Sequence, residues 1–493
     1  MKHHLRIYPE KKRKPARVRY RIVALLSLLL AQPATQALEL PDIGDTSESY
    51  LSLTEENELG SAFMRNLRGA LDIVSDPEIE SYITSLGERL TTNSNSQQQF
   101  HFFVINDSTI NAFAGPGGHI GINTGLIMTS ETESELASVV AHEIAHVTQR
   151  HLARAFEASQ ESVVPTTAAI IAAIILASQD SAMASAALAT ALASSTQTRI
   201  NFTRQNEKEA DRLGMSLLAS SHFDPQGMPS FFERLYRHNK AYDSQSIEFL
   251  RTHPLTLSRV SDTRNRADQY APVKQLDQTH YHLIKTKIEA LGSRDNEKNI
   301  AHFENLLAKE TPQKNIYRYG YALSLAKAGK YQQAMAEIKT LVMQEPERMN
   351  YQVAAANIAY SAGDLAQAAA ICHENLKIFP HHHALTSLHS VILIKQGKAK
   401  QANALLRDHL RRHPRNPQLY KLLAQSEHLN KNLSASHEAL AEYYYFMGLT
   451  HSSLEQLDIA LDHLQTSDAG ASARIEYRKN QLKTELKKSE EKK

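Results

Sequence analysis

Residues 142–146 read His-Glu-Ile-Ala-His and match the pattern H-E-x-x-H. On a helix, His142 and His146 lie one turn apart on the same face, where two imidazoles can bind one Zn²⁺ ion. Glu143 is adjacent to both and can reach a water molecule on the metal. Zinc lowers the pKa of such a water toward about 7, and a carboxylate base completes its activation. The stretch therefore predicts a helical, metal-dependent hydrolytic site.

The residues around the motif predict the helix that carries it. Apolar side chains recur there at helical intervals, at Leu136, Val139, Val140, Ile144 and Val147. Ser130-Glu-Thr-Glu133 has the spacing of a capping box, with acidic residues in the first turn. We therefore expect the helix to begin at Ser130.

The composition upstream of this helix predicts a small sheet. Phe100–Ile105 is aromatic and β-branched, which is typical of a strand. The glycine-rich stretch Ala114-Gly-Pro-Gly-Gly118 lies between short apolar runs and predicts a tight connection. Strands at 100–105 and 120–122 can expose an edge that binds an extended peptide by strand addition, with a fully paired sheet as the alternative.

A catalytic zinc needs a third protein ligand and an open fourth position. Gln149 and Leu152 occupy the positions where metzincins have a glycine and a histidine, which excludes that subclass and leaves His151 as a solvated or outer-shell residue. Farther along, Asn206-Glu-Lys-Glu-Ala-Asp-Arg212 has a helical pattern. One of its acids can bind the metal while another accepts an imidazole N–H. Spacing alone leaves both Glu207 and Glu209 as candidate ligands.

His-Glu-Ile-Ala-His, followed about 60 residues later by Glu-x-x-x-Asp, resembles the gluzincin family of prenyl-protein (CaaX-type) and heat-shock endopeptidases. Further matching segments are Asn111–Gly118, Gly125–Ile127 and Thr252-His-Pro254 followed by Arg259. The resemblance implies an α+β zincin-like metallopeptidase domain, mostly α with a small sheet. It also implies a zinc-dependent metalloendopeptidase with one Zn²⁺ per chain.

Carried over to this sequence, the resemblance assigns a role to each residue. Glu207 becomes the third metal ligand, Asp211 its outer-shell partner, and Glu209 a solvated helix residue. His253 stabilises the oxyanion or closes the site as a fourth ligand, with a structural histidine beside Pro254 as the alternative. Arg259 orients the substrate carbonyl or pairs with an acid. The implied catalytic residues are Glu143, Asp211, His253 and Arg259, and the implied metal ligands are His142, His146, Glu207 and His253.

The C-terminal part of the chain contains a repeat of 34 residues. Four prolines keep this period, Pro312, Pro346, Pro380 and Pro414. The segments 329–334, 363–368, 397–402 and 431–436 follow the same period, and the first three have the form Gly-x-x-x-x-Ala. Glycine permits a turn between two helices and proline stops the second helix, so the repeat predicts an α-solenoid of tetratricopeptide repeats.

The N-terminus has the composition of an export signal. Nine of the first 21 residues are Lys or Arg, followed by the short apolar run Ile22–Ala31 and by small residues at Thr35 and Ala37. We expect cleavage near Ala37 and a periplasmic location; an uncleaved anchor is the alternative, although the run is shorter than the roughly 20 residues that span a bilayer. Without residues 1–37 the chain has 46 basic and 52 acidic residues, a net charge of −6, which gives no electrostatic reason to expect nucleic-acid binding.

These patterns together predict five segments. They are a signal peptide at 1–37, a zinc metallopeptidase domain at 38–270, a helical connector at 271–310, a tetratricopeptide domain at 311–482 and a charged tail at 483–493. The apolar runs 163–177 and 181–193 form buried helices or a lid that touches a membrane or an apolar substrate. The single Cys372 excludes an intrachain disulfide and is expected to pack inside a repeat. His381-His-His383 is expected in a solvated turn, because three consecutive side chains do not share a face; a metal site is the alternative.

The signal peptide and the repeats make the chain similar to periplasmic members of the gluzincin family. That similarity implies a metalloendopeptidase, with chaperone activity as an option, in the assembly and quality control of outer-membrane proteins. Its clients would be misfolded or stalled outer-membrane proteins, with the barrel-assembly machinery bound through the repeats. The alternative is a repeat scaffold or chaperone with a latched or structural zinc. The intact Glu143 argues against a structural site, which does not need that carboxylate.

Overall fold

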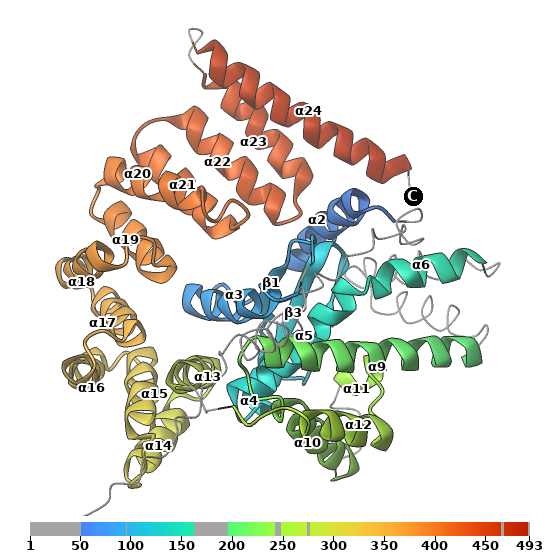
Figure 1. Ribbon diagram of the computed structural model, residues 1–493. Coiled ribbons are helices and arrows are strands. Elements are labelled where there is room, and N and C mark those ends of the chain that lie inside the picture. Colours follow the sequence, from blue (N-terminus) through green and yellow to red (C-terminus); the bar gives the residue numbers. More distant parts are fainter. Residues whose placement is uncertain are drawn as a thin grey trace, which may run out of the picture. The chain divides into compact units, whose positions relative to one another are not determined.

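The computed structural model describes residues 51–94, 96–161, 196–241, 248–273, 277–464 and 468–491. The expected signal peptide and both apolar runs, 163–177 and 181–193, lie outside these residues. Within the described residues, one three-stranded sheet is surrounded by helices (Figure 1). A membrane-spanning helix is absent from this part of the chain, since none of its helices combines the necessary length and hydropathy.

The sheet has the strand order β1-β3-β2. Its strands are β1 (His101–Ile105), β2 (Ala112–Ala114) and β3 (His119–Asn123), with β1 parallel and β2 antiparallel to β3. The predicted strands at 100–105 and 120–122 are confirmed. The expectation that residues 120–122 form an edge is wrong, because the chain returns through β2 and leaves β3 in the centre.

Side chains alternate across the sheet and bury both of its faces. The helices concerned are α2 (Leu53–Ala70), α3 (Pro77–Thr91) and α5 (Glu133–Thr148). Phe102 and Val104 pack into the main core with α3 and α5, whereas Phe103 and Ile105 pack against Phe63 of α2. This period of two is what a strand buried on both faces requires.

The helix that carries His142 starts later than its sequence suggests. Thr132 is the N-cap of α5, and its hydroxyl accepts a hydrogen bond from the Glu135 N–H at 3.2 Å. The predicted start at Ser130 is wrong, because a preceding short helix, α4 (Thr124–Thr129), ends there. The Ser130 hydroxyl instead donates to the carbonyl of Ile127 at 2.9 Å.

A close helix pair brings the acidic segment against the histidine motif. The next helices are α6 (His151–Glu161), α9 (Thr196–Ser220), α10 (Gly227–Ala241), α11 (Glu248–Thr252) and α12 (Leu257–Ala267). Helix α9 packs along α5. A Cβ at Gly214 would lie 3.1 Å from the backbone nitrogen of His142, so a larger residue there would push the two helices apart by a few tenths of an ångström. Asp211 and Glu207, one and two turns earlier on α9, consequently face α5.

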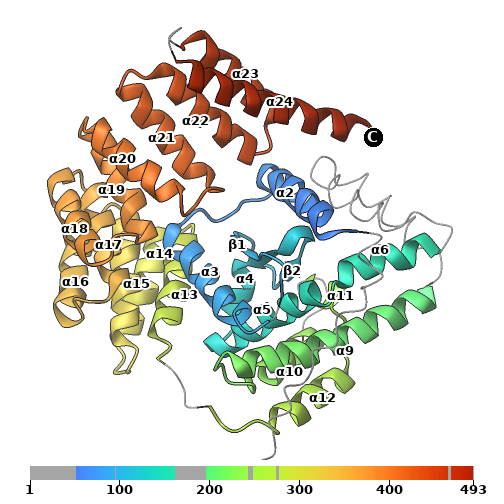
Figure 2. The ribbon, with the colours of Figure 1, turned by 45° about the horizontal axis from the view of Figure 1, so that its top comes forward.

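The C-terminal part is a run of antiparallel helix pairs (Figure 2). Its helices are α13 (Thr279–Gly292), α14 (Asn296–Leu307), α15 (Lys314–Lys327), α16 (Tyr331–Gln344), α17 (Met349–Ser361), α18 (Leu365–Ile378), α19 (His383–Lys395), α20 (Ala399–Leu410), α21 (Pro417–Leu429), α22 (Leu433–Phe446), α23 (Thr450–Asp462) and α24 (Ala469–Glu491). Segment 483–491, predicted as a charged tail, continues α24.

The turns within these pairs explain the repeated glycine. Gly329, Gly363 and Gly397 have φ values of 78°, 85° and 72°, a left-handed conformation that favours glycine. Lys431 adopts the same conformation at the fourth turn, with φ of 63°. Cys372 is fully buried in the repeat core, as expected. The predicted fold class, a mostly helical domain with a small sheet followed by a tetratricopeptide solenoid, is confirmed.

The described residues form one compact unit, and buried polar contacts cross it. Lys287 of α13 lies 2.6 Å from Glu78 Oε2 at the start of α3. The Asn350 side chain of α17 donates to Glu78 Oε1 at 2.9 Å. These contacts tie α3 to the connector and to a repeat helix.

Candidate metal centre

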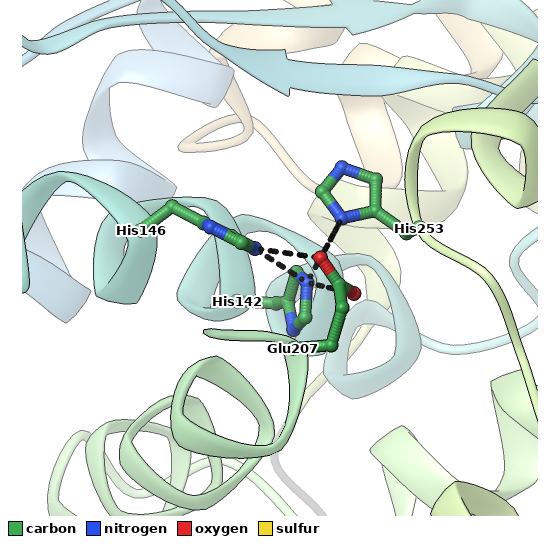
Figure 3. Close-up of side chains that lie close together, drawn as sticks. All are labelled: His142, His146, Glu207 and His253. Atoms are coloured by element: carbon green, nitrogen blue, oxygen red, sulfur yellow. Dashed lines mark hydrogen bonds and ion pairs between the residues drawn. The ribbon is translucent and has the colours of Figure 1, made fainter. Parts of the chain in front are cut away.

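Four side chains from three parts of the chain point toward one another (Figure 3). His142 and His146 come from α5, Glu207 from α9, and His253 follows α11. The separations are 3.0 Å between His146 Nε2 and His142 Nε2, 3.4 Å from each of these atoms to a Glu207 oxygen, and 3.0 Å from His253 Nδ1 to Glu207 Oε1. A tetrahedral ion with bonds of about 2.0–2.2 Å separates its ligand atoms by roughly 3.3–3.6 Å. The four donors therefore fit around a single ion.

The carboxylate of Glu143 lies beside this cluster and is unusually placed. The residue is 1% exposed, and its Oε1 accepts no hydrogen bond from any described residue. His253 Nε2 is 3.5 Å away from that oxygen. Because buried polar atoms are normally hydrogen-bonded, the free oxygen fits a group that works on a water or substrate. Two imidazoles and a carboxylate are a donor set that zinc accepts, so the residues present fit a metal ion.

Asp211 and Arg259 hold His142 from behind. Asp211 Oδ1 lies 3.1 Å from His142 Nδ1, the nitrogen that faces away from the cluster. The Arg259 guanidinium donates to both oxygens of Asp211 at 2.7 Å and lies 2.8 Å from Glu207 Oε2. Of the two roles open for Arg259, the structure shows pairing with acids. Asp211 and Arg259 are therefore positioning residues in this geometry.

His151 is the outer partner of His146, which is one of the two roles that the sequence left open for it. His146 Nδ1 lies 2.8 Å from His151 Nδ1, and His151 Nε2 lies 3.3 Å from Glu209 Oε2. Glu209 also accepts a hydrogen bond from Arg154 at 2.9 Å. The expectation that Glu209 is a solvated helix residue is wrong, because His151 and Arg154 of α6 contact its carboxylate.

The protonation of the two motif histidines differs because of these partners. Burial alone would lower the pKa of His142, but hydrogen bonds to Asp211 and Glu207 raise it to about 10. Burial lowers the pKa of His146 to about 3. Burial opposes ionisation of Glu207, yet the charge of His253 and hydrogen bonds from the histidines hold its pKa far below the ordinary value. The buried carboxylates thus make the site favourable for positive charge.

Phe249 holds the ring of His253 in place, a contact that no sequence motif predicted. The His253 ring stacks on Phe249, with centroids 4.7 Å apart and an interplanar angle of 27°. The Phe249 N–H in turn donates to the carbonyl of Ile110 at 3.1 Å, just ahead of β2. These two contacts place His253, which follows α11, at the cluster.

Comparison with known proteins identifies the family of the chain. The model of peptidase family M48 matches residues 77–267, and a tetratricopeptide repeat model matches residues 359–426. The beta-barrel assembly-enhancing protease of Escherichia coli (strain K12) is 34% identical over 466 residues, which cover 94% of this chain and 95% of that protein. This chain belongs to the beta-barrel assembly-enhancing protease family.

Two further relatives match this chain, one over nearly its whole length and one over a shorter part. The putative beta-barrel assembly-enhancing protease of Vibrio cholerae is 35% identical over 463 residues, covering 92% of this chain and 95% of that protein. Mitochondrial metalloendopeptidase OMA1 of Schizosaccharomyces pombe is 29% identical over 198 residues, covering 40% of this chain and 54% of OMA1. The match to peptidase family M48 and the names of these relatives make the protein a metalloprotease.

Proposed function

We propose that the protein is a zinc endopeptidase that is exported to the periplasm and cleaves misfolded or stalled outer-membrane proteins. The observation that carries the proposal is the buried Oε1 of Glu143, which accepts no hydrogen bond from the described residues, beside four converging donors. When held by His142, His146 and Glu207, a zinc ion supplies Lewis-acid polarisation of the scissile carbonyl and makes water more acidic.

The side chains around the cluster have separate roles in the proposed mechanism. Glu143 takes a proton from the attacking water at Oε1 and passes it to the leaving nitrogen. Asp211 and Arg259 keep the His142 ring in one orientation, and His151 does the same for His146. The catalytic roles of Glu143 and His253 rest on their place at the cluster, whereas Asp211 and Arg259 act through the residues that they hold.

Strand β2 supplies a docking edge for the substrate backbone. Among the described strands it pairs with β3 alone, and Phe113 and Ala114 are partly exposed. An extended segment of an unfolded client can add to such an edge through main-chain hydrogen bonds, which suits an enzyme that reads backbone rather than one side chain.

The test replaces single carboxylates in the purified mature chain. With an unfolded outer-membrane β-barrel protein as substrate, Glu143→Gln is expected to lower the cleavage rate by about 10²–10⁴-fold while the bound metal stays unchanged. Glu207→Gln is expected to lose both metal and cleavage. Glu131→Gln, at an exposed carboxylate before α5, is the control and retains both. Cleavage by Glu143→Gln at the wild-type rate would refute the proposal.

A second candidate function is a chaperone or scaffold whose site is latched. His253 favours it, because its Nδ1 lies 3.0 Å from Glu207 Oε1 and 3.3 Å from His142 Nε2, inside the donor set. If the ring closes the fourth metal position, His253→Ala raises basal cleavage. Equal or lower cleavage instead assigns His253 to oxyanion stabilisation or to structure.

The proposed location and partners rest on the N-terminal segment and on the repeats. The basic and apolar segment 1–37 supports export, and a chain isolated from the periplasm is then expected to begin near Leu38, as amino-terminal sequencing can check. The solenoid supports recruitment of the barrel-assembly machinery. A peripheral membrane contact through 163–193 and the absence of nucleic-acid binding belong to the same proposal.

A further inference from the structure

Three histidines of the repeats form a second convergent cluster. His383 opens α19, His409 lies in the last turn of α20, and His413 follows that helix. His383 Nδ1 lies 2.7 Å from His409 Nε2, and the His413 ring centroid lies 4.4 Å and 4.5 Å from those of His383 and His409. One nitrogen from each of the three rings lies within 4.8 Å of the others. His383 is 8% exposed, so the solvated turn expected for it is wrong.

The fold explains why these rings meet. Helices α19 and α20 are antiparallel, so the first residue of α19 lies beside the last turn of α20. The His413 N–H donates to the His409 carbonyl at 3.1 Å, which continues the helical turn by one step. His409 and His413 are therefore four residues apart on one face, the same spacing as His142 and His146.

The third ring also has a carboxylate behind it. His383 Nε2, the nitrogen directed away from His409, lies 3.4 Å from Glu80 Oε2 on α3. The Asn416 side chain donates to the same oxygen at 3.4 Å. A carboxylate that accepts the outer N–H of an imidazole fixes the tautomer that presents the inner nitrogen to a metal. Asp211 stands in the same relation to His142.

The remaining ring nitrogens are available to a ligand. Within the described part of the chain, the His413 ring makes ring contacts but no hydrogen bond, and His409 shares only the contact with His383. The neighbouring Arg412 guanidinium is directed to the His381 ring, at 2.9 Å, outside the cluster. Three imidazoles suit zinc, nickel or copper and not calcium or magnesium, which prefer oxygen ligands.

We propose that His383, His409 and His413 bind a second divalent transition-metal ion, of the zinc class. The ion would join the start of α19 to the end of α20, and through Glu80 it would reinforce the contact of both helices with α3. The site is separate in sequence and in ligands from the one that contains Glu143.

The experiment counts metal ions in the metal-stripped full mature chain during titration with Zn²⁺ or with Co²⁺ as a spectroscopic probe. The wild type is expected to bind two equivalents. His413→Gln and His409→Gln are expected to bind one tightly, with affinity for the second lowered by at least about tenfold, because each change removes a side chain that would contact the ion directly. His381→Gln, at the exposed neighbour outside the cluster, is the matched control and retains two.

Two further measurements keep the outcome decisive. His142→Ala is expected to lose the first equivalent and to keep the second, which separates this proposal from the proposed zinc of the protease site. His413 is the least buried of the three, so His413→Gln is expected to keep the wild-type circular dichroism spectrum and decides the matter if His409→Gln fails to fold. A wild type that binds one equivalent, or a folded His413→Gln that binds two with unchanged affinity, would overturn the proposal.

Discussion

The cluster between α5 and α9 and the cluster between α19 and α20 share a local spacing but differ in their surroundings. Each has two histidines four residues apart, His142 with His146 and His409 with His413. Two buried carboxylates face the first pair, and their hydrogen bonds outweigh burial and raise the His142 pKa to about 10. His409 has imidazole neighbours, and burial lowers its pKa to about 3. Burial acts in the same direction at both places, so the carboxylates decide the difference.

The two clusters differ in the charge that surrounds them. Around His142, negative charge is fixed in the fold before any cation binds, and Arg259 keeps it from being left unpaired. Around His409, the neighbours are imidazoles, and burial keeps the pKa of His409 low, so its ring offers a lone pair rather than a charge. Removing charged groups should therefore disturb the first cluster much more than the second.

The largest effect is expected for Arg259→Met. The substitution leaves the buried carboxylates of Asp211 and Glu207 without their cation, which typically costs about 3–5 kcal/mol. Denaturant unfolding of the metal-stripped chain measures the loss. Arg264→Met, on the same helix α12, is the control, because Arg264 and its partner Glu233 are 37% and 39% exposed and such a pair contributes about 0–1 kcal/mol. Equal costs for the two variants would contradict the argument.

An intermediate effect is expected for the outer carboxylates, compared by zinc competition with a chelator. Asp211→Asn should lower zinc affinity at the first cluster by about 10–100-fold, since a buried outer-shell partner is lost. Glu80→Gln should lower affinity at the second cluster by less than about tenfold, because the Glu80 side chain is 36% exposed and 3.4 Å from the ring. Losses of the same size would show that the surroundings matter less than the spacing.

The smallest change in stability is expected for His119, a buried histidine outside both clusters. It shows how much a buried histidine contributes without a cluster around it. His119 Nδ1 lies 3.0 Å from the Pro116 carbonyl, and burial lowers the His119 pKa to about 3. The pKa of His119 in the folded state lies below the unfolded value of 6.5. The contribution of the neutral His119 ring to the free energy of unfolding is therefore complete above pH 6.5 and is lost as the pH falls toward 3. His119→Asn can donate the same hydrogen bond without titrating.

Urea midpoints of the wild type and His119→Asn at pH 8 and pH 5 check this contribution. The variant is expected to be less stable by about 1 kcal/mol at pH 8, and the gap should narrow toward pH 5. His101, whose ring is 4.8 Å from that of His119, titrates in both proteins and cancels in the comparison. A gap that stays constant between the two pH values would show that His119 does not carry the acid sensitivity.

The parts of the site that sequence could predict are those set by spacing on one helix. His142, Glu143 and His146 follow from one helical turn, and the family pattern adds Glu207. The contact of His151 with His146 could not be predicted, because it depends on the left-handed backbone at Arg150, with φ of 51°, where α6 departs from α5. The chain leaves the helical path there without any glycine or proline that would indicate it.

The same limit applies to contacts between distant elements. The strands were recognisable from composition, but the central place of β3 depends on how β2 returns, which no local pattern contains. His383 looked solvated because consecutive side chains diverge on a turn. Its burial depends on α20, whose His409 lies 26 residues away.

Gly214 has a consequence for how this protease can be tuned. A methyl group at this position would sit 3.1 Å from the His142 backbone nitrogen, tighter than most real contacts, so α9 would have to retreat by a few tenths of an ångström. Metal–ligand distances tolerate deviations of only about 0.2 Å. The absence of a side chain at Gly214 thus sets the distance between the two helices that carry the candidate ligands. Gly214 therefore controls the ligand geometry without contacting the ion.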